Sequence, residues 1–369
     1  KGATHTYTIE IKYLESTDVD QSADMGKMLS GKIFIEDKFK GGTLSEAIQY
    51  YNPTISTRTD FSTPFTTNTA NTLYKATENA TDVYYFAGQD TESTPINNWV
   101  KFGKNSSNQD LYWRIIRTNS DGSIRLLYHG TSTTATDAYI GASKFNTTIN
   151  SPKYVGYMYG NSDTTPEEAR TNINDSTIKA YIDNWYANNM TSYTEYLSTT
   201  AVYCNDREVG SGAIYSISSD FTYAASTRLY TNKTPTYDCT NNNDKFTVDA
   251  SSGNGKLTYP IALMTADEIA YAGGVHATNA PMWYYTNSTL ESSTGSSWWW
   301  SLSPGYWNGT GVGSLYVSGS HNPGLLGSYY VSNSYDVRPV VSLKSCIKYS
   351  TGNGASDTPY EILETSSGC

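Results

Sequence analysis

Charged residues are scarce in this sequence, and positive charge is the scarcer sign. Asp, Glu, Lys and Arg make up 16% of the 369 residues, and 25 basic residues against 35 acidic ones give a formal charge of −10. A protein that binds nucleic acid needs clustered Lys and Arg to displace counterions from phosphates. The chain contains no basic run. We therefore expect no nucleic-acid partner.

Long apolar runs are missing too. No stretch of the sequence approaches the roughly 20 apolar residues that span a bilayer. The chain opens with Lys1-Gly2-Ala3-Thr4 rather than with the charged and then apolar segments of a signal peptide. We interpret it as a mature or truncated ectodomain, which meets a membrane only through a missing N-terminal anchor.

Tyrosine, by contrast, is abundant. The chain has 33 tyrosines, and aromatic residues make up 14% of it. Disordered chains are poor in aromatic residues, so disorder throughout is excluded. At roughly 100–200 residues per domain, the length predicts about two domains or one large domain with an extension.

The four cysteines are Cys204, Cys239, Cys346 and Cys369, and none of them forms a C-x-x-C pair. No second type of zinc ligand lies at the usual spacing from them. Together with the composition rich in Tyr, Ser, Thr and Asn, this favours disulfides in an exported protein. Cys204 with Cys239 is the preferred pairing, because it closes the shortest internal loop apart from the Cys346–Cys369 tail. Free buried thiols are the alternative.

The residue pattern divides the chain into three regions. Residues 1–53 are expected to form a β-rich N-terminal extension, because residues 6–13 alternate strictly and residues 32–35 are a second apolar run. Residues 54–72 are a Thr/Ser-rich tract without periodicity, which predicts a linker. Residues 73–369 then form the main domain.

Several strands and helices are expected from local signals. The expected strands are rich in aromatic or branched residues and lie at Val83–Phe86, Trp99–Phe102, Leu111–Arg117 and Ile124–Tyr128. Asp121-Gly122 predicts a hairpin between the last two, since this pair accepts the positive φ of a tight turn. Thr43, Thr165 and Ser176 each predict the start of a helix. Residues 204–256 lack periodicity and are expected to be long loops.

The clearest local signal lies at residues 263–274. Thr265 is expected to cap a short helix, Glu268 completes a capping box, and two glycines end the helix. The segment resembles the L-P-T-E-x-E-W-x-x-A-x-x-G-G motif of the formylglycine-generating-enzyme type of C-type lectin fold. Met264 and Ile269 stand where that family has proline and tryptophan.

A second signal lies downstream, where two apolar runs frame a polar and aromatic segment. The runs are Trp298–Pro304 and Val337–Leu343, and residues 306–336 between them are rich in Tyr, Trp, Asn, Ser and Gly. This layout resembles the variable proteins of diversity-generating retroelements and related modules on surface proteins of gut Firmicutes. The resemblance covers about residues 73–349. It implies a C-type-lectin-like fold that displays a diversified binding surface on a bacterial cell or outside it.

The composition of the framed segment favours binding independently of the resemblance. Tyr and Trp supply large amphipathic contact area, and Ser, Gly and Asn supply adaptable hydrogen bonds, as in antibody paratopes. The predicted ligand-contacting residues all lie within the frame and are Tyr306, Trp307, Asn308, Tyr316, Ser318, Ser320, His321, Asn322, Ser328, Tyr329, Tyr330, Ser332, Ser334, Tyr335 and Asp336. The alternative is that these tyrosines pack on neighbouring strands, since the whole chain is rich in tyrosine.

The sequence gives little support for catalysis or metal binding. Formylglycine-generating enzymes need a reactive cysteine pair near the C-terminal core, and Cys346 has no close sequence partner of that pattern. The histidines are isolated in sequence, and residues 309–313 lack the G-K-[ST] of a phosphate loop. Calcium-binding lectins of this fold use a Trp-Asn-Asp triplet, whereas this chain has Trp307-Asn308-Gly309. We expect no enzymatic activity, no cofactor and no metal.

These observations predict an α+β protein, with an N-terminal β-rich extension followed by a C-type-lectin-like domain. Its expected function is non-enzymatic binding, in the manner of a receptor or adhesin. The expected partner is a protein or glycan ligand on another cell or a phage. The alternative is a structural or minor pilin-like surface subunit with no diversified site.

Overall fold

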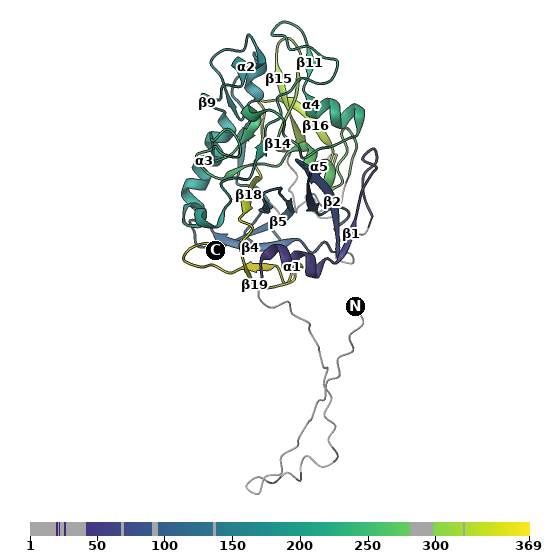
Figure 1. Ribbon diagram of the computed structural model, residues 1–369, viewed down its shortest axis with the longest axis vertical. Coiled ribbons are helices and arrows are strands. Elements are labelled where there is room, and N and C mark those ends of the chain that lie inside the picture. The colour runs from purple at the N-terminus through teal and green to yellow at the C-terminus, as the bar shows by residue number, and fades with distance from the viewer. Residues whose placement is uncertain are drawn as a thin grey trace. The chain divides into compact units, whose positions relative to one another are not determined.

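The computed structural model describes residues 20, 22, 26, 42–67, 70–90, 95–135, 138–280, 298–319 and 322–369. The chain divides into two units, Lys1–Phe39 and Lys40–Cys369. All helices and strands described below belong to the second unit. It mixes helices with two larger sheets (Figure 1), which confirms the α+β class. The strands expected at residues 6–13 and 32–35 lie outside the described residues.

A ten-stranded sheet is the larger of the two. Its strands follow the order β1-β2-β3-β5-β4-β20-β19, and β6, β18 and β13 continue it from β5. Because β5 pairs with β3, β4 and β6, the sheet curls into a half barrel. The strands are β1 (Thr54–Ser56), β2 (Thr72–Glu78), β3 (Thr81–Tyr85), β4 (Trp99–Lys104), β5 (Asp110–Thr118), β6 (Ile124–Gly130), β13 (Ile261–Leu263), β18 (Pro339–Leu343), β19 (Tyr349–Thr351) and β20 (Tyr360–Ile362).

The predicted strands at the centre of this sheet are confirmed. β5 and β6 form an antiparallel hairpin, and Gly122 in its turn has a φ of 80°, which favours glycine. β18 pairs with both β6 and β13, so its residues lie in the middle of the half barrel. Val340 and Val341 are fully buried there, as expected for the apolar run at 337–343.

The predicted helix starts are confirmed by their caps. Thr43, Thr165 and Thr265 each form a capping box with the Glu three residues later, and Ser176 accepts from the backbone N–H of Lys179. These side chains satisfy backbone N–H groups that have no partner inside the helix. The helices are α1 (Leu44–Tyr51), α2 (Pro166–Ala169), α3 (Thr177–Asn189), α4 (Ala224–Thr227) and α5 (Ala266–Ala272).

A six-stranded mixed sheet contains the framed segment. The order is β16-β15-β14-β17-β7, and β11 pairs with the end of β14. Figure 1 shows β14, β15 and β16 in the upper part of the second unit. The strands are β7 (Ala142–Lys144), β11 (Phe221–Thr222), β14 (Trp299–Trp307), β15 (Val312–Val317), β16 (Leu326–Tyr330) and β17 (Ser334–Asp336).

Short elements connect the two sheets. Two-stranded pairs are formed by β8 (Met158–Tyr159) with β9 (Asn174–Asp175), and by β10 (Tyr203–Cys204) with β12 (Lys245–Phe246). Single turns of helix lie at η2 (Pro152–Val155), η3 (Thr191–Tyr196), η4 (Arg228–Asn232) and η5 (Asn242–Asp244). Residues 204–256 thus hold only brief elements between long loops.

The segment at residues 54–72, expected as a linker, makes specific contacts where it is described. Its strand β1 pairs in parallel with β2. The buried Arg58 guanidinium donates to the carbonyls of Ala270 and Tyr271, at 3.3 and 2.5 Å, and lies over the Phe61 and Phe65 rings. These contacts fasten the segment to α5, and the boundary between the two units falls earlier, between residues 39 and 40.

Two disulfides close loops in the second unit. Cys204 is bonded to Cys239, as the sequence predicted, and Cys346 is bonded to Cys369. The first bridge spans 35 positions and encloses β11, α4 and η4. None of the helices in the described ranges is both long and apolar enough to cross a membrane.

Candidate functional site

The framed segment brings most of its aromatic side chains together at the surface around the β14, β15 and β16 strands. We call this surface the tyrosine face, and it consists of Trp298, Tyr306, Tyr316, Tyr329, Tyr330 and Tyr335. Five of these side chains are half-buried, and Tyr329 is 44% exposed. On the same strands, Leu302, Val312 and Leu315 are fully buried. The sheet therefore combines a buried core with a series of partly exposed rings.

The rings of the tyrosine face form a continuous series. Trp298 stacks on Tyr316 at 5.0 Å between ring centroids, and Tyr335 contacts both at 5.1 and 5.3 Å. Tyr329 lies 6.5 Å from Tyr335 and 5.7 Å from Tyr330. Tyr306 ends the series, 5.9 Å from Tyr330. Each distance suits offset or edge-to-face contact between rings.

Two glycines explain why these rings lie close to the sheet. Gly313 pairs with Tyr306, and a Cβ placed on Gly313 would lie 2.5 Å from Cε1 of that ring. Gly327 pairs with Tyr316, and a Cβ there would lie 2.9 Å from its Cζ. Any larger residue would displace the rings. The ring over a glycine covers backbone that has no side chain of its own.

The hydroxyls of Tyr306, Tyr316 and Tyr335 remain protonated at neutral pH. Burial and the neighbouring Tyr330 and Tyr329 raise the pKa of Tyr306 to about 12. Burial, followed by nearby tyrosines, also raises the pKa of Tyr316 and of Tyr335. Each protonated hydroxyl can both donate and accept a hydrogen bond. The face thus offers polar groups without offering charge.

Polar residues hold one end of the face in place. The Asn308 side chain donates from Nδ2 to the Tyr330 hydroxyl at 2.8 Å. Its Oδ1 accepts from the backbone N–H groups of Thr310 and Gly311, at 3.1 and 2.8 Å, and so closes the turn between β14 and β15. The segment at residues 309–313 is therefore a turn leading into β15.

The structure places ten of the fifteen predicted contact residues on or beside the tyrosine face. On or beside the tyrosine face lie the five predicted tyrosines together with Asn308, Ser328, Ser332, Ser334 and Asp336, all exposed or half-buried. Asn322 is exposed at the other end of the β15–β16 hairpin, away from Asn308. Ser320 and His321 lie outside the described residues.

Trp307 and Ser318 do not fit the predicted contact surface. Both side chains are only 2% exposed. Neighbouring residues on a strand point to opposite sides, so Trp307 faces inward where Tyr306 faces outward. Ser318 directly follows β15, and its N–H donates to the Leu325 carbonyl at 2.8 Å. We therefore remove both residues from the contact surface.

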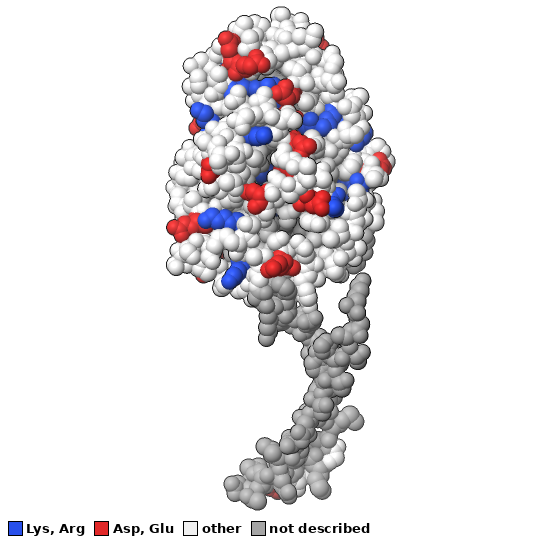
Figure 2. Space-filling model, in the orientation of Figure 1, with Lys and Arg blue, Asp and Glu red and all other residues white. Residues whose placement is uncertain are grey.

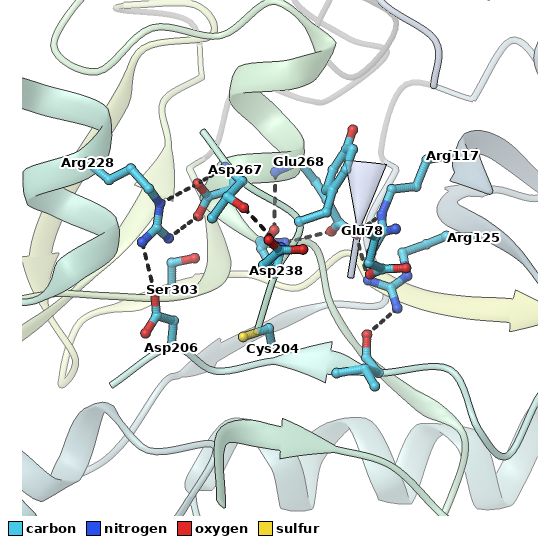
Figure 3. Close-up of a pocket in the computed structure, with 14 residues that line it drawn as sticks. Glu78, Arg117, Arg125, Cys204, Asp206, Arg228, Asp238, Asp267, Glu268 and Ser303 are labelled. Carbon is cyan, nitrogen blue, oxygen red and sulfur yellow. Dashed lines mark hydrogen bonds and ion pairs between the residues drawn. The ribbon is translucent and has the colours of Figure 1, made fainter. Parts of the chain in front are cut away.

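A second cluster, of charged residues, lines a pocket between α5 and the ten-stranded sheet (Figure 3). Glu268 of α5 binds Arg117 and Arg125 at 3.0 and 2.6 Å, and Arg117 also binds Glu78 at 2.9 Å. All four side chains are nearly inaccessible to solvent. Burial opposes the charge of Glu268, yet the two arginines hold its pKa below the usual value.

The cluster continues into the disulfide-closed loop. Arg228 bridges Asp267 of α5 and Asp206 of the loop, at 2.7 and 3.0 Å. Burial raises the pKa of Asp206 despite this arginine. Figure 3 shows Arg228 between these two carboxylates, with Cys204 nearby. These ion pairs connect the disulfide-closed loop, helix α5 and the ten-stranded sheet. We therefore interpret the cluster as structural.

The described part of the chain offers no group of three or more His, Cys, Asp or Glu that could hold a metal ion. All four cysteines are in disulfides. The comparison with known proteins adds no identity, because no family model, curated protein or solved structure matches the chain.

Sequence reasoning missed two features of the site. Trp298 was expected to belong to an apolar frame, yet it is partly exposed and stacks on the Tyr316 ring. The signal that could have revealed it is strand alternation: if Trp299 points into the core, the neighbouring Trp298 points away from it. Exposed isoleucines at 214 and 217 were missed as well, because they lie in a loop without periodicity.

Proposed function

We propose that this chain is a non-enzymatic ligand-binding protein, extracellular or at a bacterial cell surface, whose binding site is the tyrosine face. The observation that carries the proposal is the continuous series of partly exposed, uncharged rings on a sheet whose strands are otherwise largely buried. Aromatic side chains of this kind bind with little loss of conformational freedom. Because the rings are attached to a rigid sheet, the loss of conformational entropy on binding is smaller still.

The scaffold proposed for this face is a C-type-lectin-like domain of the formylglycine-generating-enzyme type. Support comes from the capped helix α5 at the motif of residues 263–274 and from the buried frame on both sides of residues 306–336. Diversification of that segment by a retroelement is part of the proposal. A reverse-transcriptase gene and a near-repeat of the segment beside this gene would support it, and a locus that lacks both would contradict it.

Binding is tested with two defined probes, a glycan array and a phage-displayed library of random peptides. The immobilised protein should select members of one of them. Changing Tyr306 and Tyr329 to Ser should then weaken binding of the selected probe by about 30-fold or more, because aromatic anchors contribute about 2 kcal/mol or more. The matched control is Tyr50→Ser on α1, since Tyr50 is 40% exposed.

The outcome also separates binding from a purely structural role. The exposed Tyr329 should change the free energy of unfolding by no more than about 0.5 kcal/mol. A double variant that binds as well as Tyr50→Ser would contradict the proposal. So would a double variant that unfolds as readily as a core variant, because its rings would then be structural.

A further inference from the structure

A loop outside the framed segment carries unusually exposed apolar side chains. In residues 210–220, which we call the isoleucine loop, Ile214 is 84% exposed and Ile217 is 49% exposed. These are large aliphatic side chains. Their exposure to water is unfavourable, and burial against a partner would remove this cost in free energy. A single exposed apolar residue needs no explanation, but two beside a binding surface do.

The isoleucine loop lies against one end of the tyrosine face. Immediately after it, Thr222 of β11 pairs with Tyr306 of β14. The carbonyl oxygen of Ser218 would lie 3.5 Å from a Cβ placed on Gly309, in the turn that Asn308 closes. The Asn308 side chain in turn binds the Tyr330 hydroxyl. Loop, turn and ring series are therefore neighbours.

The loop is held in one shape rather than left free. Tyr215, between the two isoleucines, donates from its hydroxyl to the Asp163 carbonyl at 2.9 Å and packs on Phe221 at 5.3 Å. The Ser216 hydroxyl accepts from the N–H groups of Ser218 and Ser219, at 3.2 and 2.9 Å. The Cys204–Cys239 bridge closes the surrounding segment. A loop that these contacts hold in one conformation loses little conformational entropy when it binds a ligand.

Charged residues are nearly absent from the two segments that supply the loop and the rings. Residues 209–222 and 298–336 contain no Lys or Arg, and their only acidic residues are Asp220 and Asp336. Over the face of the second unit that Figure 2 shows, acidic and basic side chains are interspersed among uncharged ones. The centres of protein–protein interfaces have this composition, with aromatic residues enriched and Lys, Glu and Asp depleted.

We propose that the isoleucine loop is a second part of the binding site, and that the ligand is a protein whose contact surface is apolar and uncharged. This inference rests on the proposed function of the tyrosine face. Sugar hydroxyls placed against Ile214 and Ile217 would lose hydrogen bonds to water without replacement. An apolar protein surface loses none and gains contact with both isoleucines and the rings.

The test uses the full chain and the phage-displayed peptide library as probe. Peptides selected on the wild-type protein should be rich in apolar residues and lack net charge. For a synthetic copy of a selected peptide, Ile214→Ser with Ile217→Ser should weaken binding about tenfold or more, while the melting temperature stays unchanged. The matched control is Ile55→Ser on β1, since Ile55 is 52% exposed.

The outcomes separate this inference from the proposed function. If Tyr306→Ser with Tyr329→Ser weakens binding and the isoleucine variant does not, the loop is no part of the site and only this inference fails. If neither variant weakens binding, both fail. Selection of glycans but no peptides, or of strongly charged peptides, overturns the class of partner. A concentration-dependent dimer that the isoleucine variant abolishes would make a second copy the occupant, and would overturn it too.

Discussion

The second unit contains two tyrosine clusters that differ in what covers them. The buried tyrosine cluster, Tyr74, Tyr85, Tyr237 and Tyr271, packs at β2 and β3, and none of its members is more than 9% exposed. Arg117 lies over the Tyr237 ring at 4.2 Å, and Arg58 fastens the neighbouring segment. The tyrosine face has no cation in its own segment.

The comparison shows that an abundance of tyrosine does not by itself indicate a binding site. In the buried cluster, rings stack tightly, as Tyr237 and Tyr271 do at 4.1 Å, beneath segments that come from distant parts of the chain. On the tyrosine face, Gly313 and Gly327 lie against the Tyr306 and Tyr316 rings, and the ring series stays partly exposed. The two clusters share a residue type. They differ in how deeply the rings are buried and in whether an arginine lies beside them.

The largest expected effect separates the two clusters by stability. Tyr85→Ala should lower the free energy of unfolding by about 3–5 kcal/mol, as for other large aromatic residues removed from a core. Tyr329→Ala should change it by no more than about 0.5 kcal/mol. Chemical denaturation of both variants measures the difference. Equal losses would end the distinction between the clusters.

The ion pairs beside the buried cluster should matter nearly as much. Glu268→Gln leaves Arg125 without its carboxylate in a site that water hardly reaches, so we expect a loss of about 3–5 kcal/mol in unfolding free energy. The control is Lys75→Gln, which breaks a surface pair with Asp82 at 2.7 Å and should change the unfolding free energy little, because solvent screens the pair. A Glu268 variant as stable as this control would show that the network is dispensable.

The disulfide beside the isoleucine loop gives the next effect. Replacing Cys204 and Cys239 by Ser should lower the unfolding free energy by about 3–4 kcal/mol in the chain-entropy model, given the 35 positions that the bridge spans. A non-reducing peptide map of the wild-type protein should show this linkage directly. Recovery of both residues as free thiols from alkylated, unreduced protein would contradict it.

Acid should weaken the fold through two histidines outside the tyrosine face. Burial, with Arg114 and Arg338 nearby, holds the pKa of His129 well below its usual value, and burial with Lys233 lowers the pKa of His276 to about 4. Both are therefore neutral in the fold and take a proton on unfolding below about pH 6.5.

Stability should accordingly fall as the pH drops from about 6.5 towards 4, by about 1.4 kcal/mol per pH unit for each histidine. His129→Leu should remove its share of this slope, since neither ring nitrogen has a hydrogen-bond partner among the described residues. Unfolding curves across this pH range measure the slope. An unchanged slope in the variant would assign the acid sensitivity to other groups.

Local signals in the sequence predicted much of this fold. Capping residues such as Thr265, the Asp121-Gly122 turn and the apolar runs that frame residues 306–336 each depend on neighbours in sequence. Contacts between distant residues could not be predicted in the same way. Arg125 and Glu268 are 143 positions apart, and Arg58 reaches carbonyls more than 200 positions away.

The candidate site was predicted less well than the fold. A segment in which Tyr, Ser and Gly alternate irregularly does not reveal which residues are accessible, so Trp307 and Ser318 were predicted to lie on the contact surface although both are buried. The isoleucine loop has no hydrophobic periodicity, and it lies near the site because β11, the strand that follows it, pairs with β14.

Hydroxyl-radical footprinting, read residue by residue by mass spectrometry, tests the central claim most directly. In the free protein, Tyr329 and Tyr50 should be oxidised, while Tyr85 and Tyr237 should stay unmodified because they are buried. A selected peptide should protect Tyr329 and leave Tyr50 as reactive as before. An unreactive Tyr329 in the free protein, or one that stays equally reactive with the peptide bound, would contradict the claim that the tyrosine face is the binding surface.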